Sequence, residues 1–392
     1  MEPQPFPGPM RRRGPRPLAQ HLIHAMLLSA ASNVESPTSS AASIPLSPNH
    51  GAAPERAWPD AELIAGIAAY RRHPWQREQP EQPVIWREGA TRLLDYSQPS
   101  ASSALPVAPT LLFVPSLVNR AHILDLLPQR SMLRFLAARG VRPLLLDWGW
   151  PDARSRQFSL TDYIAGRLER AVVAADAPAL VLVGYCMGGL LALAAALRRP
   201  DRIAALVLLA TPWDFHADPA ASAPLAQLRP LLEAALLTMG QLPVDALQML
   251  FAAIDPGAVA AKYRAFAALD PQSERATLFM AVEDWANDGV PLAASVAREC
   301  LDGWYGANTP ARGEWLVAGL PVDPTALRMP CLVVVPDRDR IVPPDAALPL
   351  AGLIPGSGTH RIDTGHIGMA AGAHAAVDLW QPMLDWVRSL PP

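Results

Sequence analysis

Short apolar runs alternate with helical stretches through the middle of the chain. Apolar runs at 110–114, 142–146, 180–183 and 204–209 predict buried strands, and helical spacing predicts helices at 131–139, 160–174 and 190–197. Strands that are buried on both faces and separated by helices of this length are typical of a parallel sheet with helices on both sides. The pattern therefore predicts an α/β fold.

The alternation of predicted strands and helices stops after Thr211 and Pro212, and residues 213–300 carry helical patterns only. The clearest are 228–239, 246–253 and 275–286, after which the sheet resumes at 331–335 and a last helix is expected at 375–387. An all-helical insertion in such a protein is expected to form a lid over the carboxyl ends of the strands. We therefore predict a sheet core in two parts, 56–212 and 301–392, interrupted by a helical lid at 213–300.

The first 55 residues are rich in Pro, Ser, Ala and Asn, and we expect a disordered arm at 1–55. Three arginines before an apolar stretch at 22–31 resemble a signal peptide, but Pro and His residues interrupt that pattern and favour an amphipathic helix. Downstream, Leu63, Ile64 and Ile67 predict a helix, residues 84–93 alternate like a strand, and 98–109 is expected to be a linker.

Composition narrows the class of protein. The chain has 392 residues, 51% of them hydrophobic, and a net charge of −3, which argues against binding to nucleic acid. Its three cysteines, Cys186, Cys300 and Cys331, are too few and too scattered for a disulfide framework or a zinc site, so we expect a reducing, cytoplasmic setting. No apolar run reaches 18 residues, so no transmembrane segment is expected.

The most informative segment is the strand at 180–183, which breaks into Gly184, Tyr185, Cys186, Met187, Gly188 and Gly189 before a helix rich in Ala and Leu. A strand, a Gly-x-Cys-x-Gly turn and a helix have the layout of a nucleophile elbow, here with sulfur as the nucleophile. The helix N-terminus favours a thiolate. The alternative is an inert buried cysteine on a glycine-rich bend.

A cysteine nucleophile needs a base and a group that orients the base. In α/β-hydrolase order the acid follows a later strand and the histidine lies near the C-terminal end. Asp339 and Asp337 both follow the predicted strand at 331–335; we favour Asp339 because Ile341 and Val342 return the chain to the core after it.

For the base we favour His366, which follows a glycine just before the last helix, over its competitors His360, His374 and His122. The oxyanion hole needs two backbone amides, one from Met187 and one from the loop after the first core strand, where Leu117 and Val118 both stay candidates. These features predict the α/β-hydrolase fold.

The residues resemble the polyhydroxyalkanoate synthases, in particular the short, class III-like type that works with a partner subunit. The similarity covers roughly Trp86 to the C-terminus. It rests on the elbow, on Asn119 to Leu126, on Leu146 to Gly149, on Asp214 and Phe215, and on the lid residues Glu283, Trp285, Asp288, Gly289 and Pro291. The chain departs from the family in two segments: it has Arg340 after Asp339, where the family has His, and it has Ala121 and His122, where the family has Pro and Tyr. We hypothesise that Arg340 pairs with Asp214.

The resemblance implies a triad of Cys186, Asp339 and His366. It also implies polymerisation of 3-hydroxyacyl groups from coenzyme A thioesters into polyester, with no cofactor beyond that substrate. The partners that it implies are a separate subunit, a second copy of this chain in a homodimer, and the surface of a polyester granule. Two other interpretations remain: a thioesterase or intracellular polyester depolymerase with the same cysteine, and a catalytically silent granule-associated homologue.

Overall fold

The computed structural model describes residues 12–23, 60–78, 81–97 and 109–391. Contacts between residues divide the chain into two units, which are described separately. One unit, the sheet unit, combines Arg77–Ile254 with Asp288–Pro392. The other, the helical unit, combines Met1–Gln76 with Asp255–Asn287.

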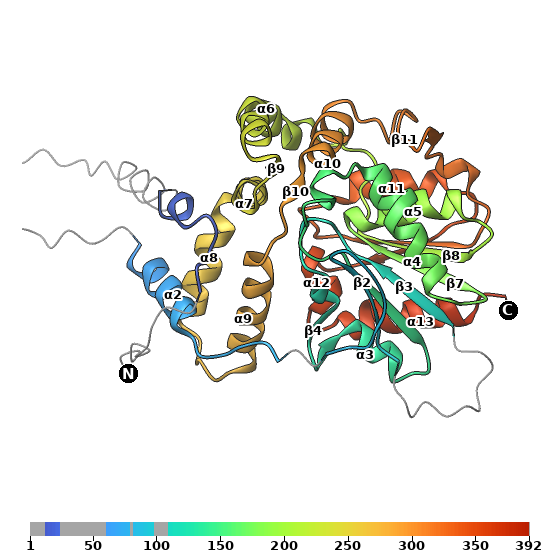
Figure 1. The fold of residues 1–392 in the computed structure, drawn as a ribbon. Helices are drawn as coiled ribbons and strands as arrows, with labels where there is room; N and C mark the ends of the chain where they lie inside the picture. Colours follow the sequence, from blue (N-terminus) through green and yellow to red (C-terminus); the bar gives the residue numbers. More distant parts are fainter. Residues whose placement is uncertain (1–11, 24–59, 79–80, 98–108, 392) are drawn as a thin grey trace, which may run out of the picture. The chain divides into compact units, whose positions relative to one another are not determined.

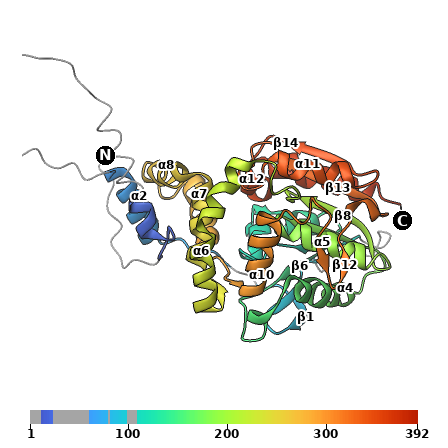
Figure 2. The same cartoon turned by 90° about the horizontal axis from the view of Figure 1, so that it is seen from above.

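The sheet unit is built around eight strands in the order β1-β2-β6-β3-β7-β8-β13-β14, with β1 and β14 at the two edges (Figure 2). Strands β1 and β2 form an antiparallel hairpin that joins β6 antiparallel, and all other pairs are parallel. The predicted α/β fold is therefore confirmed. The strands are β1 Val84–Glu88, β2 Thr91–Asp95, β3 Thr110–Val114, β6 Arg142–Asp147, β7 Leu180–Tyr185, β8 Ile203–Leu209, β13 Cys331–Pro336 and β14 Gly358–Ile362.

Helices cover both faces of this sheet (Figure 1). Helices α4 (Glu169–Ala174), α5 (Met187–Arg198) and α11 (Pro344–Leu353) pack on the face that carries Leu112, Leu182 and Leu208. Helices α3 (Met132–Ala137) and α13 (Gln381–Arg388) lie on the opposite face. Successive residues of a strand point to opposite faces of the sheet. Since helices cover both faces, the central strands are apolar along their whole length.

The sheet unit also contains shorter elements. Its two-stranded sheets are β4 Asp125–Leu127 with β5 Arg130–Ser131, β9 Gln241–Leu242 with β10 Leu292–Ala293, and β11 Leu316–Val317 with β12 Leu320–Pro321. Its remaining α-helices are α6 Pro219–Met239, α7 Val244–Ile254, α10 Ala294–Arg298 and α12 His366–Ala371, with π-helical turns at Asp162–Leu168, Glu299–Gly306 and Ala376–Trp380 and 3₁₀ turns at Ala121–Leu124, Ser155–Gln157 and Pro324–Ala326.

The helical unit consists of α2 (Ala61–Arg72), α8 (Pro256–Ala267), α9 (Glu274–Asn287) and the N-terminal segment 12–23. Its apolar core joins residues of α2, namely Leu63, Ile67 and Tyr70, to residues of α8 and α9. The backbone of α2 at Gly66 lies so close to the Tyr263 carbonyl that a Cβ there would clash. Close approach of the two helices therefore requires glycine at this position.

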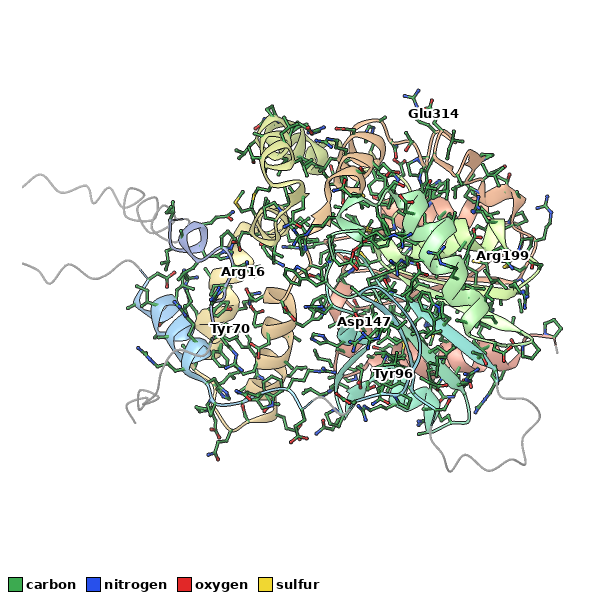
Figure 3. The ribbon with its side chains drawn as sticks, in the orientation of Figure 1. Arg16, Tyr70, Tyr96, Asp147, Arg199 and Glu314 are labelled. Carbon is green, nitrogen blue, oxygen red and sulfur yellow. The ribbon has the colours of Figure 1, made fainter. Side chains whose placement is uncertain are left out.

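Hydrogen bonds of charged and polar groups join the N-terminal segment to the rest of the helical unit. The Arg12 guanidinium donates two hydrogen bonds to the Asp284 carboxylate, at 2.5 and 2.9 Å, and others to the carbonyl oxygens of His73 and Trp75. The Tyr70 hydroxyl donates to the same carboxylate at 2.9 Å, and the Arg16 amide donates to Asn287 at 2.8 Å; Arg16 and Tyr70 are labelled in Figure 3. The N-terminal segment is thus tied to helices α2 and α9.

The structure differs from the expected domain boundaries in physically clear ways. Residues 61–72 bury their apolar face against α8 and α9, so they belong with the helical unit and not with the sheet core. Helices α6 and α7 contribute Leu232, Leu236 and Leu247 to the core of the sheet unit, so most of the predicted lid belongs there. The role of 213–300 as a lid remains a prediction.

Three further segments differ from the prediction: residues 84–93, strand β14 and the N-terminal arm. The run 84–93 is a hairpin because Gly89, with φ 58°, turns the chain between β1 and β2. Strand β14 was not predicted, since its residues are mostly polar at the edge of the sheet. The expected disorder of the N-terminal arm does not hold for residues 12–23; the rest of 1–55, with the apolar stretch beyond residue 23, lies outside the described residues, as does most of the linker at 98–109.

No helix in the part of the chain that the structure describes is by itself both long enough and apolar enough to cross a membrane. Helix α7 and the helix that follows it meet the criterion only when both are counted together.

Candidate active site

Cys186 stands between β7 and α5 in a strained backbone conformation, with φ 56° and ψ −129°. A non-glycine residue in this region costs about 1–3 kcal/mol and persists only when the surrounding structure enforces it. Here the Cys186 amide donates to the Leu209 carbonyl at 2.8 Å, and the Cys186 carbonyl accepts from the Gly189 amide at 2.9 Å. The turn has the geometry predicted for a nucleophile elbow, with the thiol at the N-terminus of α5.

The glycine at 188 lets this turn fit against the sheet. A Cβ on Gly188 would overlap the carbonyl oxygen of Val114 in β3. The first turn of α5 therefore lies directly against the end of β3, whose following loop carries Leu117 and Val118. The sequence pattern Gly-x-Cys-x-Gly-Gly is explained by this close packing.

Asp339 and His366, the predicted acid and base, lie together. The Nδ1 atom of His366 is 2.6 Å from Oδ2 of Asp339, and both residues are buried. The other carboxylate oxygen, Oδ1, accepts hydrogen bonds from the amides of Ile341 and Val342 at 2.8 and 2.9 Å. Asp339 is therefore held by the segment that follows it and orients the imidazole through Nδ1.

The electrostatic environment of His366 links it to Cys186. Burial opposes the charged imidazolium, but the negative charge of Cys186 and hydrogen bonds with Asp339 and Cys186 outweigh burial and raise the pKa of His366 to about 10. His366 thus interacts with both Asp339 and Cys186, the other two residues of the predicted site. Such an arrangement is able to support nucleophilic acyl transfer.

Tyr185, next to the nucleophile, was not singled out in the sequence as part of the site. Its hydroxyl donates to the backbone carbonyl of His366 at 3.0 Å, and the two rings are 5.1 Å apart. Burial, together with the charges of Cys186 and Asp339, raises the pKa of Tyr185, so the hydroxyl keeps its proton and remains a donor. A single residue in a motif gives no sign of such a distant partner.

The competing residues lie elsewhere. Asp337 is exposed and pairs with Arg361 at 2.6 Å. His360 lies on the edge strand β14 and contacts the carbonyl of Asp378 at 2.7 Å, and His374 is exposed. His122 lies on the 3₁₀ turn Ala121–Leu124, half-buried. The structure brings none of these four residues into the cluster formed by Asp339 and His366.

The predicted oxyanion donors lie at the carboxyl ends of neighbouring strands. Met187 is the first residue of α5, and the first amides of a helix have no acceptor within it. The Val118 amide donates to the hydroxyl of Ser116 at 3.3 Å, and the Val118 carbonyl accepts from Val290. Since the Val118 amide has this partner, Leu117 is the better candidate for the second donor, which stays a prediction.

A second polar group near the carboxyl edge was not found from the sequence. Asn308, which is buried, donates from Nδ2 to the Asp214 carboxylate at 2.8 Å and accepts from the Phe215 amide at 3.0 Å. Asn308 therefore fixes the segment that follows β8. The pairing of Asp214 with Arg340 stays a prediction. No local sequence pattern around Asn308 indicates that it binds this segment.

Within the described ranges, no three His, Cys, Asp or Glu side chains are grouped as a metal ion would require.

Comparison with known proteins agrees with this architecture. The alpha/beta hydrolase fold family matches residues 109–372, about two thirds of the chain, which include the elbow, Asp339 and His366. The chain is therefore an α/β hydrolase in fold.

Two relatives define the family more narrowly. The poly(3-hydroxyalkanoate) polymerase subunit PhaC of Allochromatium vinosum is 30% identical over 314 residues, which cover 78% of this chain and 87% of that protein. The subunit PhaC of Haloferax mediterranei is 30% identical over 321 residues, which cover 77% of this chain and 63% of the relative's length. This chain belongs to the poly(3-hydroxyalkanoate) polymerase family, as its sequence motifs predicted.

Among solved structures, the thioesterase domain from the curacin biosynthetic pathway is 16% identical, with a TM-score of 0.48, and the match covers 80% of this chain and 100% of that one.

Proposed function

We propose that this protein is a polyester synthase that transfers 3-hydroxyacyl groups from coenzyme A thioesters to Cys186 and then to a growing polyester chain. The observation that carries the proposal is the cysteine held in a strained turn beside the buried pair of Asp339 and His366. Membership of the polymerase family supports the same reaction. The intact cluster also argues against the catalytically silent interpretation.

The first half-reaction loads the enzyme. The raised pKa of His366 favours an imidazolium, and in the proposed reaction Cys186 acts as the thiolate nucleophile. The sulfur attacks the thioester carbonyl, a bond from Sγ to the acyl carbon forms, and the bond from that carbon to the sulfur of coenzyme A breaks. His366 gives its proton to the departing thiolate, so free coenzyme A leaves and a neutral imidazole remains.

The second half-reaction extends the chain. The 3-hydroxyl group of another acyl unit attacks the acyl-cysteine carbonyl, and the neutral His366 takes the hydroxyl proton. The ester bond forms as the bond to Sγ breaks, which regenerates the thiolate and the imidazolium. Asp339 keeps Nδ1 engaged throughout, so that Nε2 is the nitrogen that moves the proton.

The tetrahedral intermediates need stabilised oxyanions. We assign the amides of Met187 and Leu117 to this task, because they belong to adjoining strand ends next to Cys186. Water must be kept from the acyl-enzyme, since its attack would convert the same site into a hydrolase. Helices in 213–300 are the elements to which we assign this exclusion.

A partner subunit belongs to the proposal as well, because the relatives are named as subunits. We also retain a homodimer and association with a polyester granule as expected assembly states. Size-exclusion chromatography with light scattering, with and without a candidate partner, would measure them.

The decisive experiment uses purified protein and 3-hydroxybutyryl-coenzyme A. Thiol release with insoluble polymer supports the synthase, thiol release with free acid supports the thioesterase or depolymerase, and no release supports the silent homologue. Cys186→Ala should abolish release, whereas Cys300→Ala, a buried cysteine in another element, should retain it. Release that survives Cys186→Ala would contradict the assignment of the nucleophile.

A further inference from the structure

An exposed tryptophan lies near an arginine at the carboxyl edge of the sheet. Trp150 is 42% exposed, whereas the other tryptophans among the described residues are buried or half-buried. The guanidinium carbon of Arg120 lies 5.2 Å from the centre of its ring, within the range of a cation–π contact. Arg120 follows β3 and Trp150 follows β6, two parallel neighbours, so both lie on the edge where α/β proteins bind ligands.

Local contacts fix this pair in place. Gly149, with φ 71°, turns the chain, and a Cβ there would overlap the carbonyl oxygen of Ala90. Asp147, labelled in Figure 3, ends β6 and accepts from the Gly149 amide at 3.0 Å. The buried Trp148 donates from its indole to the Pro115 carbonyl at 3.0 Å and so ties the β6 loop to the β3 loop. The exposed ring is therefore presented by a rigid turn.

The surroundings carry charges of both signs, from Arg77 and Arg120 and from Asp125, Asp147 and Asp288. Arg120 pairs with Asp288 at 3.3 Å, and that carboxylate is half-exposed. Burial, followed by the charges of Arg77 and Arg120, lowers the pKa of the nearby His122 to about 3, so this histidine is neutral at physiological pH. Arg77 and Arg120 therefore both lie near His122, and Arg120, the arginine at the Trp150 ring, pairs with the exposed Asp288.

The pair is also at a useful distance from the nucleophile. Strand β3 lies between β6 and β7, so the loops that carry Trp150 and Cys186 start about 10 Å apart, two strand spacings. In a coenzyme A thioester the long pantetheine arm separates the thioester from an adenosine that bears phosphate groups. Adenine stacks on an indole ring, and guanidinium groups bind phosphate strongly.

We propose that Trp150 and Arg120 form the subsite for the adenosine 3′-phosphate portion of the coenzyme A thioester, with the adenine on the Trp150 ring and a phosphate on Arg120. The inference rests on the proposed function, because that function supplies the substrate. Phosphate binding competes with Asp288 for the same guanidinium. This competition distinguishes a ligand subsite from an ion pair that only supports the fold.

The kinetic test compares two substrates, 3-hydroxybutyryl-coenzyme A and 3-hydroxybutyryl-pantetheine, which lacks the nucleotide. Arg120→Gln and Trp150→Ala should each raise the KM for the coenzyme A thioester about tenfold and leave the KM for the pantetheine thioester within twofold. Trp150→Phe, which keeps a ring, should restore most of the difference. Equal effects of the variants on both substrates would overturn the subsite.

A binding test is independent of turnover. Isothermal titration of adenosine 3′,5′-bisphosphate should show weaker binding to Arg120→Gln and tighter binding to Asp288→Asn, with no change for Arg312→Gln, an exposed arginine paired with Glu314. Weakening by both Arg120→Gln and Asp288→Asn, or no binding to the wild type, would refute the subsite. If the wild type turns over neither thioester yet binds the bisphosphate in this pattern, the proposed function fails and the subsite stands.

Discussion

The two units use buried carboxylates in opposite ways. In the sheet unit, the Asp339 side chain is 0% exposed and lies 2.6 Å from the imidazole of His366. In the helical unit, Glu283 is 3% exposed and binds Lys262 at 2.6 Å and the Tyr263 hydroxyl at 3.0 Å, both on the neighbouring helix α8. One carboxylate holds the imidazole of the predicted site, and the other joins two helices.

The difference follows from how each unit is stabilised. Central strands such as β3 are buried along their whole length, so apolar contact on both faces adds to the backbone hydrogen bonds that join the strands. The helical unit has a smaller apolar core and adds directional bonds from Arg12, Asp284 and Glu283. A buried polar pair changes the free energy of folding little when both partners are present, but removing one partner is strongly destabilising because the other stays buried without a hydrogen bond. The helical unit should therefore depend more strongly on single polar residues.

The largest expected effect separates Asp339 from Asp337. Asp339→Asn should lower kcat by about 10³–10⁴-fold, because the amide no longer stabilises the imidazolium and holds Nδ1 less firmly. Asp337→Asn, which changes a solvated carboxylate two residues away, should change kcat less than twofold. Steady-state kinetics at pH 7.5 measure both. Equal loss in the two variants would show that the acid was misassigned.

The next effect tests the polar dependence of the helical unit. Arg12→Ala should destabilise that unit by about 2–3 kcal/mol, because Asp284 loses a bidentate partner and two carbonyl oxygens lose their donor. Hydrogen exchange should accelerate in α2 and α9 while the amides of β3 and β7 keep their protection.

The control for this variant is Arg13→Ala, which removes an exposed arginine from the adjacent position and should change stability by less than about 0.5 kcal/mol. If exchange in α2 and α9 is equal in both variants, the N-terminal segment does not stabilise the helical unit.

A smaller effect measures the strain at the nucleophile. Cys186→Gly should be about 1 kcal/mol more stable than Cys186→Ala, because glycine adopts φ 56° without a Cβ clash while alanine keeps the strain. Urea denaturation of both inactive variants gives the difference. An alanine variant as stable as the glycine variant would mean that the turn stores no strain.

The last effect is a dependence on pH and concerns proton binding at His366. Because its folded-state pKa is about 10 and its ordinary value is 6.5, protonation of His366 contributes stability that is complete below about pH 6.5 and is lost as the pH rises through 10. The difference in denaturation midpoint between the wild type and His366→Gln should shrink over that interval. Cys186→Ala and Asp339→Asn should each move the NMR titration of His366 to lower pH; an unmoved titration would separate His366 from both groups.

Much of the sheet could be predicted because its strands are continuous apolar runs. The runs at 110–114, 142–146 and 204–209 coincide with β3, β6 and β8 within one residue at each end. Edge strand β14 could not be predicted, because a strand with one exposed side needs few apolar residues. The helix at 61–72 was predicted as an element but not as part of the helical unit, since periodicity shows an apolar face and not its partner.

The candidate site divides in the same way. Cys186 could be predicted from local pattern, because the strained turn needs glycines at fixed spacing. Asp339 was favoured over Asp337 because apolar residues follow it, and the amides of two of them, Ile341 and Val342, hold its carboxylate. Tyr185, Asn308 and Arg12 were missed because their partners lie far away in the sequence.

The sequence by itself determined most of the elements and the turn that carries Cys186, since helix and strand periods and the glycine turn are local properties of the backbone. Tertiary structure decided which carboxylate meets His366, how the N-terminal segment joins α9, and that Arg120 meets Trp150. The physical reason is that hydrogen bonds and ring contacts need atoms a few ångströms apart. Only packing of the whole fold brings residues so distant in sequence to that range.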